Sequence, residues 1–225
     1  ASIARLTTAG CAPTNIQRSA PSANGPSNGW LNFIQNKENH LTSINKPYMI
    51  TLQRITTSDR ELYAFLEELM TRSFPADEYR DLNELRDFTD HRTHFYNNIV
   101  LNDGCPIGLI SYWDFDDFYY AEHFAIDPAQ RNGGYGKAVL QHLCTILDKP
   151  IVLEVEMPQE EMAQRRIGFY QRNGFTLWEN EYYQPPYKAG DSFLPMRLMV
   201  HGALDSQKDY EKVKQRIYRD VYNAH

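Results

Sequence analysis

The stretch QRNGGYGKA, residues 130–138, combines three glycines with an arginine and a lysine. It follows FAID, the end of a predicted strand, and precedes VLQHLCTIL, whose apolar residues have helical spacing. A helix N-terminus leaves backbone N–H groups unpaired and carries a partial positive charge, and glycines let a ligand approach those groups closely. The sequence therefore predicts a site for a phosphate group where this helix begins.

Two common phosphate-binding loops do not fit this stretch. A Walker loop requires glycine five residues before the Gly-Lys pair and a hydroxyl residue after it, but Arg131 and Ala138 occupy these positions. A dinucleotide-binding fingerprint requires a third glycine where Val139 stands. Another kind of phosphate loop is therefore expected.

Residues 131–136, Arg-Asn-Gly-Gly-Tyr-Gly, resemble the Arg/Gln-x-x-Gly-x-Gly loop of the GNAT acetyltransferase superfamily. A second stretch, Phe169-Tyr170 followed by Gly174-Phe175, is similar to another signature of that family. The order of predicted elements also agrees over about residues 49–201. The resemblance implies an N-acetyltransferase that moves an acetyl group from acetyl-CoA to a primary amine by direct attack in a ternary complex.

The resemblance also implies which residues bind the cofactor. The loop amides would hold the pyrophosphate of acetyl-CoA, and a main-chain N–H of residues 124–126 would polarise the acetyl carbonyl. The expected cofactor-binding residues are Phe124, Ala125, Ile126, Arg131, Asn132, Gly133, Gly134, Tyr135, Gly136 and Lys137. No metal is expected.

Tyr170 matches the family tyrosine that protonates the departing CoA thiolate. A phenol with an ordinary pKa near 10 is a suitable proton donor to a thiolate. Packing beside Phe169 is the alternative role for this side chain.

Glu122 is the expected general base, because an acid in the middle of a strand is costly unless it is paired or faces a cleft. A structural role as the partner of a nearby histidine or arginine is equally open. Strand alternation places His123 on the opposite face, so only one of the two residues is expected to face the acceptor. Glu154 and Glu156 on a later strand are secondary candidates.

These residues must be positioned by a mixed α/β pattern: a strand, two helices, three strands, a helix, a strand, a helix and two strands. Thr57 or Ser58 is expected to cap the first helix, and Asn102-Asp103-Gly104 to form a hairpin turn. The fold expected from the resemblance is a single GNAT-like domain of the mixed α/β (α+β) class. Its central, mostly antiparallel, twisted sheet is flanked by helices and contains a splayed strand pair.

Composition divides the chain into three parts. Residues 1–46 are rich in Ser, Pro, Asn and Gly and predict a flexible extension. Residues 47–202 form the expected GNAT domain. Residues 203–225 predict an amphipathic helix whose stripe of Tyr210, Val213, Ile217 and Val221 packs on that domain.

The charge balance limits the partners. The chain has 23 basic and 29 acidic residues, a net charge of −6, which argues against nucleic acid. No apolar run approaches the roughly 20 residues of a membrane span. Three cysteines without metal-ligand spacing suggest reduced thiols and a cytoplasmic protein. The expected partner is an amine, carried by a small molecule or a peptide, near the stretch NEYYQPPYKAG; the resemblance also allows a homodimer.

Two other function classes remain open at this point. One is a GNAT-fold module that binds acyl-CoA without turnover. The other is a protein-interaction domain that works through the C-terminal helix and the N-terminal extension.

Overall fold

A sheet of eight strands forms the centre of the structure, a computed structural model that describes residues 48–188 and 190–224. The strand order is β1-β2-β3-β4-β5-β8-β6, with β7 also paired to β8. Only β4 and β5 run parallel, and every other pair is antiparallel. The strands are β1 Ile50–Arg54, β2 Phe95–Asn102, β3 Cys105–Asp114, β4 Tyr119–Ile126, β5 Ile151–Glu156, β6 Thr176–Leu177, β7 Tyr182–Gln184 and β8 Leu194–His201.

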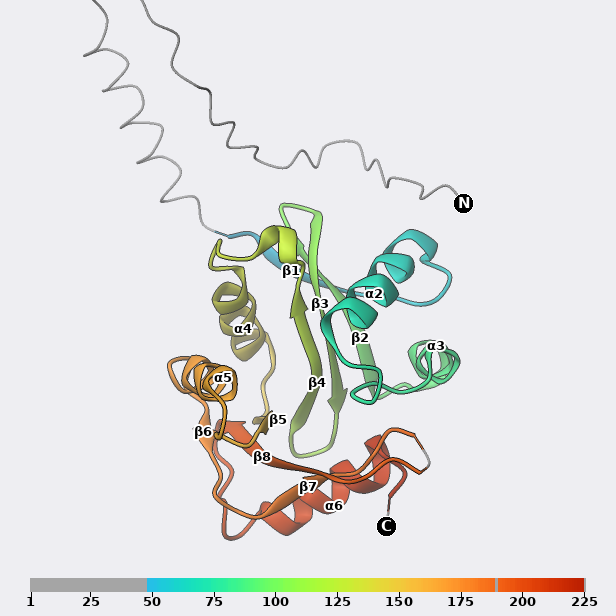
Figure 1. Cartoon of the computed structure of the whole chain (residues 1–225). Coiled ribbons are helices and arrows are strands. Elements are labelled where there is room, and N and C mark those ends of the chain that lie inside the picture. Colours follow the sequence, from blue (N-terminus) through green and yellow to red (C-terminus); the bar gives the residue numbers. More distant parts are fainter. Residues whose placement is uncertain (1–47, 189, 225) are drawn as a thin grey trace, which may run out of the picture. The chain divides into compact units, whose positions relative to one another are not determined.

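Helices cover both faces of this sheet (Figure 1). They are α2 Arg60–Ser73, α3 Leu82–His91, α4 Tyr135–Ile146, α5 Glu161–Gln171 and α6 Tyr210–Val221, with a short 3₁₀ helix, η1, at Pro128–Gln130. Buried residues of α4 and α5 share one apolar cluster, and those of α2, α3 and α6 share the other. This arrangement confirms the expected α/β class and a single domain that contains a mostly antiparallel sheet flanked by helices. None of the described helices is long and apolar enough to cross a membrane.

The hairpin between β2 and β3 has the expected turn. Asp103 and Gly104 have φ angles of 51° and 78°, and Asn102 pairs with Cys105 across the turn. Positive φ at both central residues is the geometry that matches the twist of the two strands. The prediction from Asn102-Asp103-Gly104 is therefore confirmed.

The N-cap of α2 differs from the expectation. The helix begins after Asp59, not after Thr57 or Ser58. Thr57 is instead bound to α3, where its N–H and hydroxyl donate to the Asp90 carboxylate at 2.8 and 2.5 Å. The hydroxyl thus ties the start of α2 to α3 rather than capping the helix.

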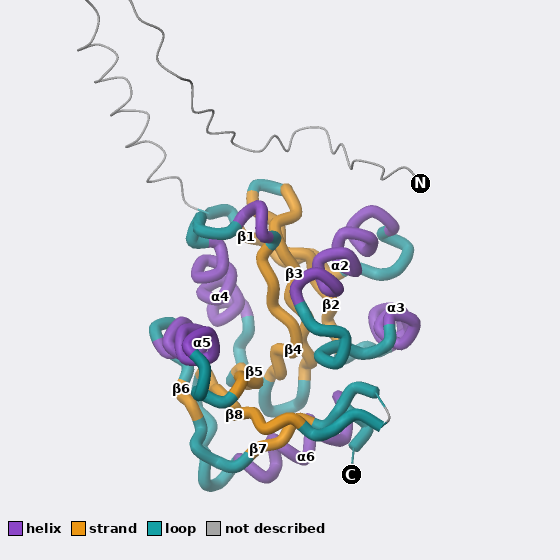
Figure 2. The backbone as a smooth tube through the Cα atoms, viewed as in Figure 1, coloured by secondary structure: helices purple, strands orange, loops and turns teal. Residues whose placement is uncertain are grey.

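The C-terminal part of the chain completes the sheet and the core. The segment between α5 and β8 contains two short strands, β6 and β7, which pair with different parts of β8. The α6 stripe of Tyr210, Val213, Ile217 and Val221 is buried in the cluster that also holds α2 and α3. The segments before α3 and after β7 meet, since Lys188 Nζ donates to the Ala76 carbonyl (Figure 2).

Two expectations concern other parts of the chain. The flexible extension at 1–46 lies outside the described residues. The expectation of reduced thiols agrees with Cys144, which is free.

Candidate functional site

The two central strands separate in the middle of the sheet. Parallel pairing of β4 with β5 consists of Tyr119–Ile151, Tyr120–Val152 and Ala121–Leu153, and it stops there. At the same point β4 has a bulge against β3. Because Ser111 pairs with His123 and Tyr112 with Ala121, Glu122 has no opposite residue. This is the splayed strand pair that the sequence resemblance implied.

Beyond this point, the backbone groups of β4 that face β5 have no strand partner. This segment contains the predicted cofactor-binding residues Phe124, Ala125 and Ile126, which are paired only with β3. Unpaired main-chain N–H and C=O groups are costly when buried and are available to a ligand. The segment therefore offers backbone hydrogen bonds to an extended molecule lying between the strands.

Two cavities meet at the separation. One, of about 40 Å³, lies between β4, β5, α4 and α5, and its lining includes Phe124 and Tyr170. We call it the inner cavity. The other, of about 300 Å³, opens toward the α2–α3 segment and β8, and we call it the acceptor cavity. Glu122, His123 and Glu154 line both cavities.

The glycine loop lies at the far end of β4 and starts α4. Gly134 is the N-cap, and its φ of 76° and ψ of 2° belong to the left-handed region that favours glycine. It provides no side-chain cap, and the first turn of α4 contains no acidic residue. Residues 131–134 and Lys137 are exposed. The loop therefore places the N-terminus of α4 beside two exposed cationic side chains, Arg131 and Lys137, as an anion site requires.

Tyr170 of α5 combines both roles that the sequence left open. Its ring packs against Phe169 and Phe175, with centroids 5.3 and 5.5 Å apart. Burial raises the pKa of Tyr170 to about 12, so the phenol is protonated at neutral pH. Within the described residues its hydroxyl has no hydrogen-bond partner, and the residue lines the inner cavity. The side chain is thus held by packing with its proton available to the cavity.

Glu122 is engaged by three donors. It forms a buried ion pair with Arg80, and the exposed fractions of the two side chains are 0% and 2%. Trp113 Nε1 donates to it at 2.8 Å, and the Tyr187 hydroxyl at 2.9 Å. Although burial opposes ionisation, Arg80 and the other donors hold the pKa of Glu122 below its ordinary value. The carboxylate is therefore a stable anion and a weak proton acceptor, the structural alternative noted from the sequence.

His123 faces the same side as Glu122, contrary to the expectation from strand alternation. Both residues line the acceptor cavity, because the bulge at Glu122 shifts the alternation of β4 by one residue. His123 Nε2 lies 2.9 Å from the Glu78 carbonyl and Nδ1 lies 3.3 Å from Ser111 Oγ. A carbonyl only accepts, so Nε2 carries the proton. Burial lowers the pKa of His123, and the ring is neutral.

Glu154 is a partly buried carboxylate, and the described residues give it no cationic hydrogen-bond partner. It accepts from the hydroxyls of Tyr182 and Tyr222, the latter at 2.8 Å, and from Gln184 Nε2 at 2.5 Å. Burial raises the pKa of Glu154, although these donors partly offset the shift. Glu122 and Glu154 both lie where β4 and β5 separate, but their pKa values are shifted in opposite directions, because only Glu122 is neutralised by an arginine.

The remaining charges of the acceptor cavity are acidic on balance. Glu78 and Glu156 line it, and burial together with the negative charge of Glu156 raises the pKa of Glu78. Arg166 is ion-paired with Glu156 at 2.5 Å.

Within the described residues, no group of three or more His, Cys, Asp or Glu side chains could hold a metal ion.

The sequence and the fold both match known proteins. Residues 60–175 match the sequence model of the Acetyltransferase (GNAT) family. A solved structure from Bacteroides thetaiotaomicron, assigned as a GNAT-family acetyltransferase, is 62% identical over 78% of this chain and 99% of its own, with a TM-score of 0.77.

The chain belongs to the GNAT acetyltransferase family.

More distant solved structures are also similar. A spermidine N-acetyltransferase SpeG chimera from Vibrio cholerae and hSSAT is 17% identical over 68% of this chain and 94% of its own, with a TM-score of 0.50. A GNAT family acetyltransferase from Elizabethkingia anophelis with acetyl-CoA bound is 17% identical over 68% and 98%, with a TM-score of 0.46. No curated protein sequence matches this chain.

Two residues of this GNAT site escaped the sequence analysis. Arg80 lies in the segment before α3, and Tyr222 follows α6. Nothing in the local sequence marks Arg80, because an arginine beside acidic residues normally predicts a solvated surface. The tyrosines of NEYYQPPYKAG were expected near the acceptor, and Tyr187 does line that cavity.

We expect Arg80→Met to unfold more easily than the wild type, by about 3–5 kcal/mol at neutral pH, because Glu122 is left buried without its cation. In the wild type, the Arg80–Glu122 pair stabilises the fold fully at pH values above the ordinary glutamate pKa. This stabilisation is lost as the pH falls through the lowered pKa that Glu122 has in the folded protein. In the variant, burial favours protonated Glu122, so the deficit against wild type shrinks as pH falls. Urea unfolding between pH 5 and 8 measures both effects.

The matched control is Arg86→Met, which removes an exposed ion pair with Glu67. It should change the free energy of unfolding by less than about 1 kcal/mol. An equally small loss in both variants would show that the Arg80–Glu122 pair does not hold the site.

Proposed function

We propose that this GNAT protein transfers an acetyl group from acetyl-CoA to a primary amine by direct attack in a ternary complex. The observation that carries the proposal is that the β4 segment without a β5 partner and Tyr170 border the same inner cavity. The α4 helix also lines this cavity, and its N-terminus is the glycine loop, which has no side-chain cap. Acetyl-CoA would supply the activated acetyl thioester.

The chain's residues fit this cofactor in charge and shape. The α4 N–H groups, Arg131 and Lys137 would bind the diphosphate, since the loop is exposed and free of acidic residues in the helix's first turn. The backbone of residues 124–126 would bind the pantetheine arm and orient the acetyl carbonyl. Tyr170 would donate its proton to the thiolate sulfur.

We assign the proton acceptor to Glu154 rather than Glu122. A general base works best when its pKa lies near the operating pH, and the pKa of Glu154 is raised whereas that of Glu122 is lowered. Glu154 lines both cavities, so its carboxylate is placed between an acceptor and the inner cavity. Glu122 would fix Tyr187 and Arg80 and so shape the cavity.

The acceptor is a primary amine. Glu78, Glu154 and Glu156 provide negative charge at the acceptor cavity, and Tyr187 and Phe74 provide aromatic surface for its carbon chain. These features suit a group that arrives as an ammonium ion and must lose a proton before it attacks.

Release of free thiol from acetyl-CoA, measured across a panel of small amines and peptides, tests the activity. Acceptor-dependent release is expected. Saturable acetyl-CoA binding without release on any acceptor would favour a non-catalytic acyl-CoA-binding module.

Gly136→Glu should abolish the heat of coenzyme A binding in calorimetry. Glycine 136 lies in the first turn of α4, and an added Cβ would meet Phe169 Cζ at an ordinary 3.8 Å. The substitution therefore adds a negative charge at the phosphate site without backbone strain. Gly136→Gln is the isosteric control and should bind more tightly than Gly136→Glu. Wild-type affinity in Gly136→Glu would remove the loop from the cofactor site.

Tyr170→Phe should lower kcat about 100-fold with little change in the dissociation constant of acetyl-CoA, because only the proton donor is lost. The ring and its packing against Phe169 and Phe175 are retained. Steady-state kinetics and calorimetry measure the two quantities. Unchanged turnover would show that another group protonates the thiolate.

Glu154→Gln should lower kcat about 100-fold and remove the acid limb of its pH profile at saturating acceptor. That limb is expected above the ordinary glutamate pKa, because burial raises the pKa of Glu154. Glu122→Gln is the matched control. Its pH profile of kcat should retain the acid limb, even if lower stability of this variant reduces the rate. If Glu122→Gln removes the limb and Glu154→Gln keeps it, Glu122 is the base.

A further inference from the structure

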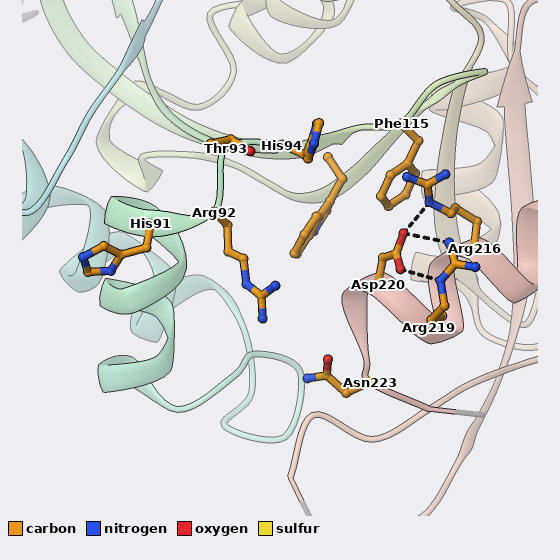
Figure 3. A pocket seen from close by; sticks show the side chains of 10 residues that line it. His91, Arg92, Thr93, His94, Phe115, Arg216, Arg219, Asp220 and Asn223 are labelled. Atoms are coloured by element: carbon orange, nitrogen blue, oxygen red, sulfur yellow. Dashed lines mark hydrogen bonds and ion pairs between the residues drawn. The ribbon is translucent and has the colours of Figure 1, made fainter.

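A third cavity, of about 370 Å³, lies apart from the candidate active site. It is bounded by the end of α3, the start of β2, the end of β3 and the C-terminal half of α6 (Figure 3). None of its lining residues lines the inner or the acceptor cavity. We call it the basic cavity, and its lining is His91, Arg92, Thr93, His94, Trp113, Phe115, Arg216, Arg219, Asp220 and Asn223.

The charge of this lining is opposite to that of the whole chain. Three arginines against one aspartate give a formal charge of +2, before any protonation of the two histidines, whereas the chain carries −6. Arg92 has no carboxylate within ion-pair distance among the described residues, and its guanidinium lies 4.7 Å from the centre of the Phe88 ring. Asp116, which does not line the cavity, also pairs with Arg216, so three arginines face two aspartates and the local balance is +1. Among the described residues of this group, Arg92 is the cation without an acidic partner.

The cationic groups are held in place by their neighbours. Arg216 lies over the Phe115 ring at 4.6 Å and pairs with Asp116 at 3.1 Å. Arg219 donates two hydrogen bonds to Asp220, at 2.7 and 3.1 Å. Side chains fixed before binding lose less conformational freedom when a ligand arrives.

The opposite wall is fixed through the backbone. Arg54 Nη2 donates to the carbonyl groups of Thr93 at 3.1 Å and Phe95 at 2.8 Å, which fastens the turn that carries Arg92 and His94. In Figure 3, Arg92 extends from the α3 side toward the α6 side, where Arg219 and Asn223 lie. The two walls thus present guanidinium groups to a common space.

We propose that the basic cavity binds a small organic or inorganic polyanion that carries two or more phosphate or carboxylate groups. The planar guanidinium fork matches both groups, and the separate walls suit a ligand with at least two of them. Trp113 and Phe115, which are 3% and 2% exposed, close the base of the cavity, so the charged groups of its walls provide the contacts. A volume of this size holds a small molecule and not a folded partner.

Trp113 connects the basic cavity to the candidate active site. Its ring lines the basic cavity, and its Nε1 donates at 2.8 Å to Glu122, which lines the two other cavities. A ligand that contacts the Trp113 ring is therefore linked to the buried Arg80–Glu122 ion pair through the single hydrogen bond from Trp113 to Glu122. The binding itself does not depend on the proposed acetyl transfer.

Calorimetry with pyrophosphate and with citrate at constant ionic strength tests the proposal. Arg92→Gln should weaken binding of the preferred probe about tenfold. Arg86→Gln removes the same charge from α3, outside the cavity, and should leave the affinity unchanged. Both variants keep the α4 loop intact, so any binding of pyrophosphate there is the same in both. The tighter probe identifies phosphate or carboxylate as the preferred group.

Protection from phenylglyoxal gives a second readout that needs no substitution. Mass spectrometry of peptides should show that the preferred probe slows modification of Arg92 and Arg219 and leaves that of Arg86 unchanged. The proposal is overturned if neither probe binds the wild type saturably, if Arg92→Gln and Arg86→Gln weaken binding equally, or if Arg92 and Arg219 remain unprotected.

Discussion

The end of parallel pairing between β4 and β5 is the constraint on which this site depends. Pairing stops after Ala121–Leu153, and a bulge places Glu122 out of register with β3 at the same level. A continuous sheet would satisfy its own backbone and leave no room between these strands. The interruption creates backbone groups without a strand partner, a cavity between the strands and a common boundary for both site cavities.

The interruption also brings two glutamates together in different environments. Glu122 is neutralised by Arg80 and held by Trp113, whereas Glu154 is surrounded by neutral donors. Buried carboxylates with different partners have pKa values that move in opposite directions. The stable anion can organise a cavity, and the carboxylate with the raised pKa can take up a proton. Such a separation of roles is common where two carboxylates serve one reaction.

The matched family region ends at residue 175, yet the site continues beyond it. β7 supplies Tyr182 and Gln184 to Glu154, and Tyr222, just after α6, donates to the same carboxylate. The buried stripe of α6 holds that tyrosine in place, and Arg216, Arg219 and Asp220 of the same helix form one wall of the basic cavity. The C-terminal helix α6 therefore positions a residue that contacts Glu154, in addition to packing in the core.

The sequence by itself determined the local features. Glycines before an apolar helical run predicted the loop, Asn102-Asp103-Gly104 predicted the hairpin, and helical spacing predicted the buried α6 stripe, because each depends on residues close together in the chain. Only the tertiary structure decided which acid meets which partner. Arg80 and Glu122 are 42 residues apart, and Tyr222 is 68 residues from Glu154. The prediction from strand alternation was wrong at His123 for the same reason. The bulge depends on the register between β3 and β4, and the sequence of β4 alone does not determine that register.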